Sequence, residues 1–181
     1  DLAYNEDGQP ARIDKGFTWE NPMSSHGLMH TVIANCYSED PYKIDTLFLY
    51  MANMAWNSSM NTEETMTKLT ERDAETGEYK IPRIIYSDSY YSETVAYADL
   101  ILPDTTYLER YDCISLLDRP IGEPDQVSDA IRWPVVKPDR DVRSFQDVLL
   151  QLGAMLELPG MVDIDKQPIY EDYADYMQKH Q

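Results

Sequence analysis

The stretch that decides the fold runs from Ile84 to Pro103 and reads IIYSDSYYSETVAYADLILP. It combines a short apolar strand, polar residues with one helical turn, and a second apolar strand. Asp88 follows Ser87, the last expected residue of the first strand, and ligands of open α/β sheets bind just beyond the carboxyl ends of strands. The carboxylate of Asp88 is therefore a candidate ligand-binding group. The local alternative is that Asp88 forms a turn and Ser92 caps the helical turn, since both residue types favour those positions.

The residues that precede this stretch complete a βαβ unit. The nearly continuous apolar run at 44–51 predicts a strand buried on both faces. Asn61 and two glutamates after it supply an N-cap and an acidic first turn for a helix that ends near Arg72. A second strand over 83–87 follows, and such a βαβ connection is right-handed. The sequence therefore predicts an α/β fold with a short, mostly parallel sheet.

The flanking regions predict further elements. An amphipathic helix begins at Ser24 or Ser25. Proline and glycine recur at short intervals in 105–138, which predicts a long ordered loop before the last core helix. Apolar residues at helical spacing predict that this helix covers 141–158 and packs on the sheet. A last amphipathic segment covers 168–179.

We expect these elements to form a single domain over residues 1–181, because this length suits one hydrophobic core. Residues 1–23 show no sustained period and predict an irregular arm. The α/β core is expected at 24–160, and a peripheral helix at 161–181.

The charge of the chain excludes several classes of partner. Fifteen basic and 33 acidic residues give a net charge of −18, which opposes binding to nucleic acid and to anionic membranes. No apolar run approaches the ~18 residues of a membrane span, so we expect no direct membrane insertion. A specific anionic ligand would have to be held by backbone N–H groups and a few chosen side chains.

The common sequence motifs for metal, phosphate and acyl chemistry are missing. Cys36 and Cys113 lie far apart, outside any CxxC pair, and are interpreted as buried free thiols. His26 and His30 stand at helical i, i+4 spacing but without an HExxH pattern, so packed or solvated histidines are the better interpretation. GxGxxG, GxxxxGK and GxSxG are all absent. We therefore assign no catalytic and no metal-binding residue.

A longer segment, IIYSDSYYSETVAYADLILPDTTYLER, resembles the catalytic subunits of molybdopterin oxidoreductases of the dimethyl sulfoxide reductase family. The resemblance continues more loosely from Ile44 through the loop after the first strand and through IRWPVVKPDRDVRSFQDVLLQLGAMLEL, so it covers most of the chain. The residues that carry the match are Asp88, Ser92, Glu93, Thr94, Ala98, Asp99, Leu102, Pro103 and Glu109.

The resemblance implies a fold and a ligand. In that family this region is the third domain, a Rossmann-like three-layer domain that binds the guanosine end of a molybdopterin guanine dinucleotide cofactor. It implies that Asp88 binds guanine. An ionised carboxylate can accept hydrogen bonds from both the ring N–H and the exocyclic amine of guanine, a pair that adenine cannot offer. Ser92 stands where relatives commonly have threonine, and it keeps the hydroxyl.

The loop after the first strand departs from the family pattern. Relatives usually show Gly-x-Asn-Pro there, whereas this chain has Ala52-Asn53-Met54-Ala55. We still expect backbone N–H groups of this loop near the ribose or pyrophosphate. The expected contacts are Ala52, Asn53, Asn57 and Ser58. The alternative is a capped loop without a ligand.

The resemblance further implies that the chain is a fragment of a larger molybdenum-dependent oxidoreductase and is inactive alone. The family's cysteine cluster for a [4Fe–4S] centre, its molybdenum-ligand region and its carboxyl-terminal cap domain have no counterpart in this sequence. The expected partners are the remaining domains of the larger protein, a membrane anchor subunit, and an iron–sulfur electron-transfer subunit. The expected compartment is the bacterial cytoplasm or periplasm, with membrane association through those partner subunits.

Within the family, the long proline-rich loop and the many tyrosines are most similar to sulfur-compound enzymes, namely polysulfide, thiosulfate or tetrathionate reductases and sulfite dehydrogenases. Two other classes stay open. One is an acidic α/β protein-interaction module without nucleotide binding. The other is a free-standing nucleotide-binding enzyme, for which no nucleophile–base pair is found.

Overall fold

The computed structural model describes residues 4, 8–9, 29–57, 61–114 and 130–179. Most of the expected arm at 1–23, the start of the first helix at Ser24 or Ser25, and Ser58 lie outside the described residues. The chain divides into two compact units, Asp1–Leu102 and Pro103–Gln181, and each is described by itself. The expectation of a single domain stays a prediction.

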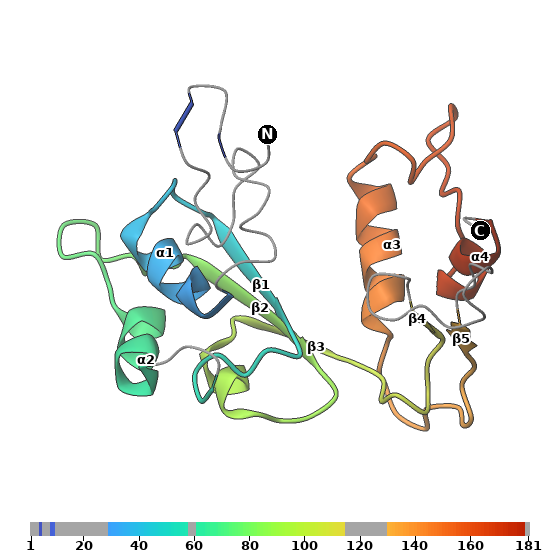
Figure 1. Ribbon diagram of the computed structural model, residues 1–181, viewed down its shortest axis with the longest axis horizontal. Coiled ribbons are helices and arrows are strands. Elements are labelled where there is room, and N and C mark those ends of the chain that lie inside the picture. Colours follow the sequence, from blue (N-terminus) through green and yellow to red (C-terminus); the bar gives the residue numbers. More distant parts are fainter. Residues whose placement is uncertain (1–3, 5–7, 10–28, 58–60, 115–129, 180–181) are drawn as a thin grey trace. The chain divides into compact units, whose positions relative to one another are not determined.

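Among its described residues, the first unit is built on a three-stranded sheet in the order β1-β2-β3 (Figure 1). β1 (Thr46–Tyr50) pairs in parallel with β2 (Arg83–Asp88), in a register that sets Leu47 beside Ile84 and Leu49 beside Tyr86. β3 (Leu100–Pro103) starts beside the beginning of β2, because the Asp99 N–H donates to Ile84 O over 2.8 Å. β3 is therefore parallel to β2 as well, and the predicted α/β fold with a short parallel sheet is confirmed.

Helices connect these strands. A 3₁₀ turn, η2 (Met29–Thr31), leads into α1 (Val32–Ser38); α2 (Thr62–Thr70) joins β1 to β2, and a second 3₁₀ helix, η3 (Glu93–Tyr97), joins β2 to β3. The predicted cap of α2 is confirmed, since Asn61 Oδ1 accepts from the Glu64 N–H at 3.3 Å. Figure 1 shows α1 and α2 beside each other, as their contacts require.

The core of this unit lies on one face of the sheet. Alternate residues of β1 and β2 are buried against α1, α2 and η3, as the two-residue period of a strand requires. The principal core residues are Ile33, Cys36, Leu47, Leu49, Leu69, Ile84, Tyr86 and Val95. The opposite face carries Phe48 and Tyr50, which are only half-buried, so the prediction of a strand buried on both faces is wrong for the described structure. The reason is that α1, α2 and η3, the described helices of this unit, all contribute residues to the one core cluster that contains Leu47 and Leu49.

The described residues of the second unit, 103–114 and 130–179, form a two-stranded sheet and two helices. β4 (Asp112–Ile114) pairs antiparallel with β5 (Ala130–Arg132), so the predicted long loop includes a pair of short strands. α3 (Phe145–Met155) is shorter than predicted because Ser144 caps it, its Oγ accepting from the Asp147 N–H at 3.2 Å. α4 (Tyr173–Lys179) contacts α3.

Part of the predicted apolar face of α3 is exposed. Leu149, Leu152 and Met155 are all solvent-exposed in the structure, although their spacing is that of a packing face. The packing of this face on the sheet stays a prediction.

A buried ion pair holds the start of the second unit to its long helix. Asp104 is fully buried, and its Oδ2 accepts from the Arg110 guanidinium at 2.6 Å. Its Oδ1 accepts from the backbone N–H of Phe145 at 3.0 Å, at the first turn of α3. Next to it, Glu109 receives two hydrogen bonds from Arg140, at 2.6 and 2.7 Å. The contacts of Asp104 satisfy a buried charge that would otherwise be costly, whereas the Glu109–Arg140 pair is exposed on its arginine side.

Candidate functional site

The carboxyl ends of β1 and β2 meet at one edge of the parallel sheet. The N–H of Met51, the first residue after β1, donates to Ser87 O over 2.9 Å. The loop 51–57 after β1 and the turn 89–92 after β2 therefore start side by side. This is the edge at which open α/β sheets bind ligands, and it carries every site residue predicted from the sequence that the structure describes.

Asn53 joins these two loops through its side chain. Its Oδ1 accepts from both the N–H (3.0 Å) and the hydroxyl (2.7 Å) of Thr94, and its Nδ2 donates to Glu93 Oε2 at 2.6 Å. Thr94 is fully buried, and its Oγ1 also accepts from the Ala55 N–H at 2.9 Å. The hydrogen bond from Asn53 holds the pKa of Glu93 below its usual range. The network fixes the loop after β1 against the start of η3.

The backbone of the loop after β1 offers hydrogen-bond donors. Within the described residues, the N–H groups of Ala52 and Asn53 donate to no protein acceptor, and both residues are half-buried. Asn57 is exposed, and its N–H donates to Asn53 O at 2.9 Å. Ser58, predicted from the same loop, lies outside the described residues.

Asp88 is the last residue of β2 and has two internal partners. Its Oδ2 accepts from the Tyr86 hydroxyl at 2.8 Å, and its Oδ1 accepts from the Tyr90 N–H at 3.0 Å. The second bond is the turn contact that the local interpretation predicts for an aspartate. The side chain is half-buried, and each carboxylate oxygen has a second lone-pair direction. A turn role and a ligand-binding role are therefore compatible in this geometry.

The predicted capping bond of Ser92 is wrong. Ser92 stands at the N-cap position of η3, but its side chain makes no capping hydrogen bond. Its Oγ lies 2.9 Å from the Tyr86 hydroxyl, which bridges it to Asp88. The physical reason is that Tyr86, two residues before Asp88 on the same face of β2, brings a buried hydroxyl to this point.

Tyr86 and Thr94 are site residues that the sequence interpretation did not assign to the binding site. Burial, against the opposing effect of the Ser92 hydrogen bond, raises the pKa of Tyr86 to about 12. The phenol thus stays protonated at neutral pH and donates to Asp88. The available signal was the two-residue strand period, which places Tyr86 and Asp88 on one face of β2.

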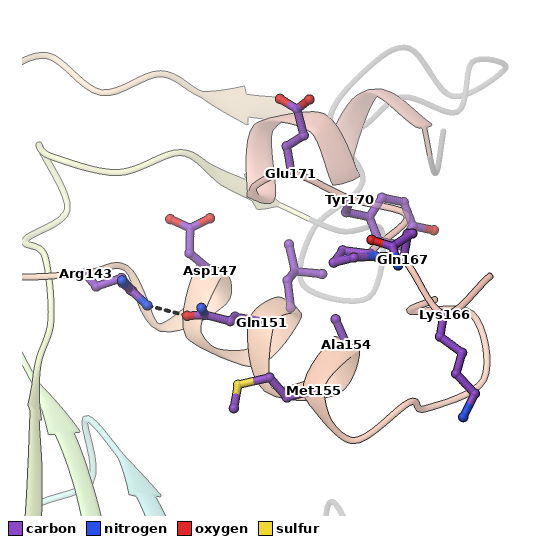
Figure 2. A pocket seen from close by; sticks show the side chains of 11 residues that line it. Arg143, Asp147, Gln151, Ala154, Met155, Lys166, Gln167, Tyr170 and Glu171 are labelled. Carbon is purple, nitrogen blue, oxygen red and sulfur yellow. Dashed lines mark hydrogen bonds between the residues drawn. The ribbon is translucent and has the colours of Figure 1, made fainter. Parts of the chain in front are cut away.

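The described residues of the second unit form a surface groove of about 870 Å³ (Figure 2). It lies between α3 and the segment 166–171. Several charged groups that line it are paired inside the protein. Arg143 donates to Gln151, Asp147 accepts from the Tyr173 N–H at 2.8 Å, and Lys166 lies 2.7 Å from Glu157. These side chains of the groove are thus already engaged in contacts within the protein.

Other chemistries find no support in the described part of the chain. Residues 4, 8–9, 29–57, 61–114 and 130–179 contain no group of three metal-ligating side chains. Neither Cys36 nor Cys113 forms a disulfide, and burial raises the pKa of the Cys36 thiol to about 12, so free thiols are confirmed. Cys113 is only half-buried. Among the same residues, no helix has the length and apolar character needed to cross a membrane.

The fold and this edge define a parallel α/β protein with a candidate site beyond the carboxyl ends of β1 and β2. Comparison with known proteins gives the protein family. No family model matches the chain. It is 51% identical over 177 residues to a sulfite dehydrogenase subunit of Allochromatium vinosum, and the match covers 98% of this chain and 18% of that protein. It is 30% identical over 153 residues to the thiosulfate reductase molybdopterin-containing subunit of Salmonella typhimurium, covering 83% of this chain and 18% of that protein.

The chain belongs to the molybdopterin oxidoreductases and is homologous to one segment of these subunits. The resemblance drawn from residues 84–110 is thereby confirmed. The chain spans about a fifth of the length of the curated relatives it matches.

Proposed function

We propose that this chain is part of a molybdenum-dependent oxidoreductase and binds the guanosine end of a molybdopterin guanine dinucleotide. The observation that carries the proposal is the Asp88 carboxylate. It stands at the carboxyl end of β2, where α/β sheets bind ligands, and its two oxygens are oriented by Tyr86 and Tyr90. The bound cofactor would supply electron transfer and oxygen- or sulfur-atom transfer at its molybdenum. The residues of this chain hold the distal nucleotide and carry out no chemistry.

The proposed contacts follow from the hydrogen-bonding groups at the edge. Asp88 accepts from the ring N–H and the exocyclic amine of guanine through the lone pairs that Tyr86 and Tyr90 leave open. The N–H groups of Ala52 and Asn53 are the proposed donors to ribose or pyrophosphate oxygens, with Asn57 and Ser58 beside them in the sequence. The side chain of Asn53 holds this loop in place. Backbone N–H donors can bind an anionic ligand in a chain of net charge −18, because they hydrogen-bond the anion without the need for basic side chains.

A calorimetric titration of the full-length protein, purified without its cofactor, tests the guanine assignment. GDP is compared with IDP, which lacks the exocyclic amine, and with ADP. We expect the order GDP, then IDP, then ADP. Asp88→Asn should weaken GDP binding about tenfold to a hundredfold, because a charge-assisted hydrogen bond contributes about 1.5–3 kcal/mol. The amide keeps an oxygen for the Tyr90 N–H, so the turn is preserved.

The matched control is Asp73→Asn, in the connection between α2 and β2. Asp73 makes the same kind of turn contact, its Oδ1 accepting from the N–H groups of Glu75 (3.0 Å) and Thr76 (2.8 Å). This variant should bind GDP like the unmodified protein. Equal affinity for GDP and ADP would refute the guanine assignment. Salt-sensitive capture of basic proteins without any nucleotide binding would favour the acidic interaction module instead.

The activity and the partners of the whole protein are a second part of the proposal. The relatives are named for sulfite and thiosulfate, so we propose a sulfur-oxyanion substrate, a [4Fe–4S] cluster outside this chain, and partner subunits for electron transfer and membrane attachment. Assay of the full-length protein for sulfite oxidation and thiosulfate reduction, with metal determination and co-purification, tests this part. A full-length protein without molybdenum or iron would contradict it.

A further inference from the structure

Two exposed tyrosines follow the candidate guanine-binding carboxylate. Tyr90 is 70% exposed and Tyr91 is 84% exposed, one after the other in the turn after β2. Large aromatic side chains exposed at a ligand-binding edge often bind a flat ligand. Burying the ring face contributes favourable binding free energy that exceeds the cost of desolvating the hydroxyl. Neither residue belongs to the core of the first unit.

The backbone of Tyr90 is fixed relative to the carboxylate. Its N–H donates to Asp88 Oδ1 at 3.0 Å, so the start of the Tyr90 side chain lies next to the group proposed to bind the edge of guanine. A base that pairs with a carboxylate through its edge lies near the carboxylate plane and leaves both of its faces to be covered. Tyr91 has the same ring and greater exposure, but its backbone N–H makes no such contact with Asp88.

We propose that Tyr90 stacks on the face of the purine whose edge Asp88 binds. This inference rests on the proposed function and adds a second recognition element to the same site. Asp88 selects guanine by hydrogen bonding, whereas the Tyr90 ring contributes affinity for a purine without distinguishing guanine from adenine, because every base has a face of this kind. Stacking also needs no positive charge, which suits an anionic ligand at the edge of an acidic protein.

Nucleotide titration of the full-length protein freed of its cofactor tests the inference. Tyr90→Ala should weaken GDP and ADP binding by the same factor, about 5- to 100-fold, the range for loss of a stacking aromatic. Tyr90→Phe keeps the ring and should retain the affinity. Tyr91→Ala is the matched control and should bind like the unmodified protein. Absorbance near the purine band should fall on GDP binding to the Tyr90→Phe variant and stay unchanged when GDP is added to Tyr90→Ala.

The outcomes separate the inference from the proposed function. If Asp88→Asn weakens GDP binding and Tyr90→Ala does not, stacking by Tyr90 is refuted and the guanine site stands. If Tyr91→Ala costs as much as Tyr90→Ala, or Tyr90→Phe costs as much as Tyr90→Ala, the assignment to the Tyr90 ring is also refuted. If no variant changes binding and GDP is not bound, both proposals fail. Circular dichroism melting of each variant checks that the exposed substitutions leave the fold intact.

Discussion

Replacing Thr94 by valine should remove the side-chain hydrogen bonds of Thr94 that hold the loop after β1 against the start of η3. Thr94 Oγ1 donates to Asn53 Oδ1 at 2.7 Å and accepts from the Ala55 N–H at 2.9 Å, and both Thr94 and Ala55 are fully buried. Valine keeps the shape and removes both bonds. The lost bond to Asn53 costs about 1 kcal/mol, and the buried Ala55 N–H left without an acceptor costs about 1–3 kcal/mol. The free energy of unfolding should fall by about 2–4 kcal/mol.

Urea unfolding, followed by tryptophan fluorescence, measures this change. With an m value of about 2 kcal/mol per M, the midpoint should fall by about 1–2 M. Hydrogen exchange gives a local measure, because the Ala55 N–H should lose its protection while the amides of β1 and β2 keep theirs. The nucleotide affinity should fall as well, since the proposed backbone donors lie in the same loop.

Two substitutions control for the loss of a threonine. Thr94→Ser keeps the hydroxyl and should cost less than about 1.5 kcal/mol, the range for small packing changes. Thr67→Val removes an exposed hydroxyl of α2, which donates to Glu63 O at 3.1 Å, and should change stability by less than about 0.5 kcal/mol. An unfolding midpoint for Thr94→Val equal to that of Thr67→Val would refute the network as a stabilising feature.

Three further predictions concern other groups. Arg140 lowers the pKa of Glu109 from 4.5 to about 2, so this carboxylate stabilises the fold above about pH 4.5 and loses that contribution as the pH falls toward 2. The melting temperature of Glu109→Gln should therefore be lower than that of the unmodified protein at pH 7. The two melting temperatures should converge near pH 2. Arg110→Ala leaves Asp104 buried without its cation and should lower the free energy of unfolding by about 3–5 kcal/mol, measured by urea denaturation; a change below about 1 kcal/mol would contradict the buried pair. Cys36, whose pKa burial raises to about 12, should not react with a thiol reagent at pH 8 until the protein unfolds, so rapid labelling of the native protein would contradict its burial.

Local sequence signals located most elements of the first unit. The short apolar runs in β1 and β2 and the Asn61 cap of α2 each act over a few residues, so they can be recognised without knowing the fold. The same signals gave the position of Asp88 at a strand end. They failed for β4 and β5, because three-residue strands separated by a long connection show no sustained period.

At the start of α3, hydrogen bonds to Ser144 and Asp104 override the helix start that apolar spacing predicts. Apolar spacing extends the helix to Asp141, but Ser144 caps it and Asp104 accepts from the Phe145 N–H at 3.0 Å. These two bonds satisfy the first-turn donors of a helix that begins at Phe145. Asp104 is 41 residues away from Phe145 in sequence, so no sequence pattern near the helix predicts this contact.

The sequence by itself determined the α/β class and the placement of Asp88 and Asn53 near strand ends, because propensity and capping are local properties. It also set the acidic surface through a net charge of −18. The burial of one main face of β1 was decided by the fold. Only the tertiary structure decided what those polar groups do. Asn53 meets Thr94 only once β1 and β2 pair in register and bring two distant loops to one edge, and Ser92 meets Tyr86 through the fold of the turn after β2. Hydrogen bonds between such loops depend on ångström-scale positions that the whole fold sets, so the partners of these side chains could not be identified from the chain alone.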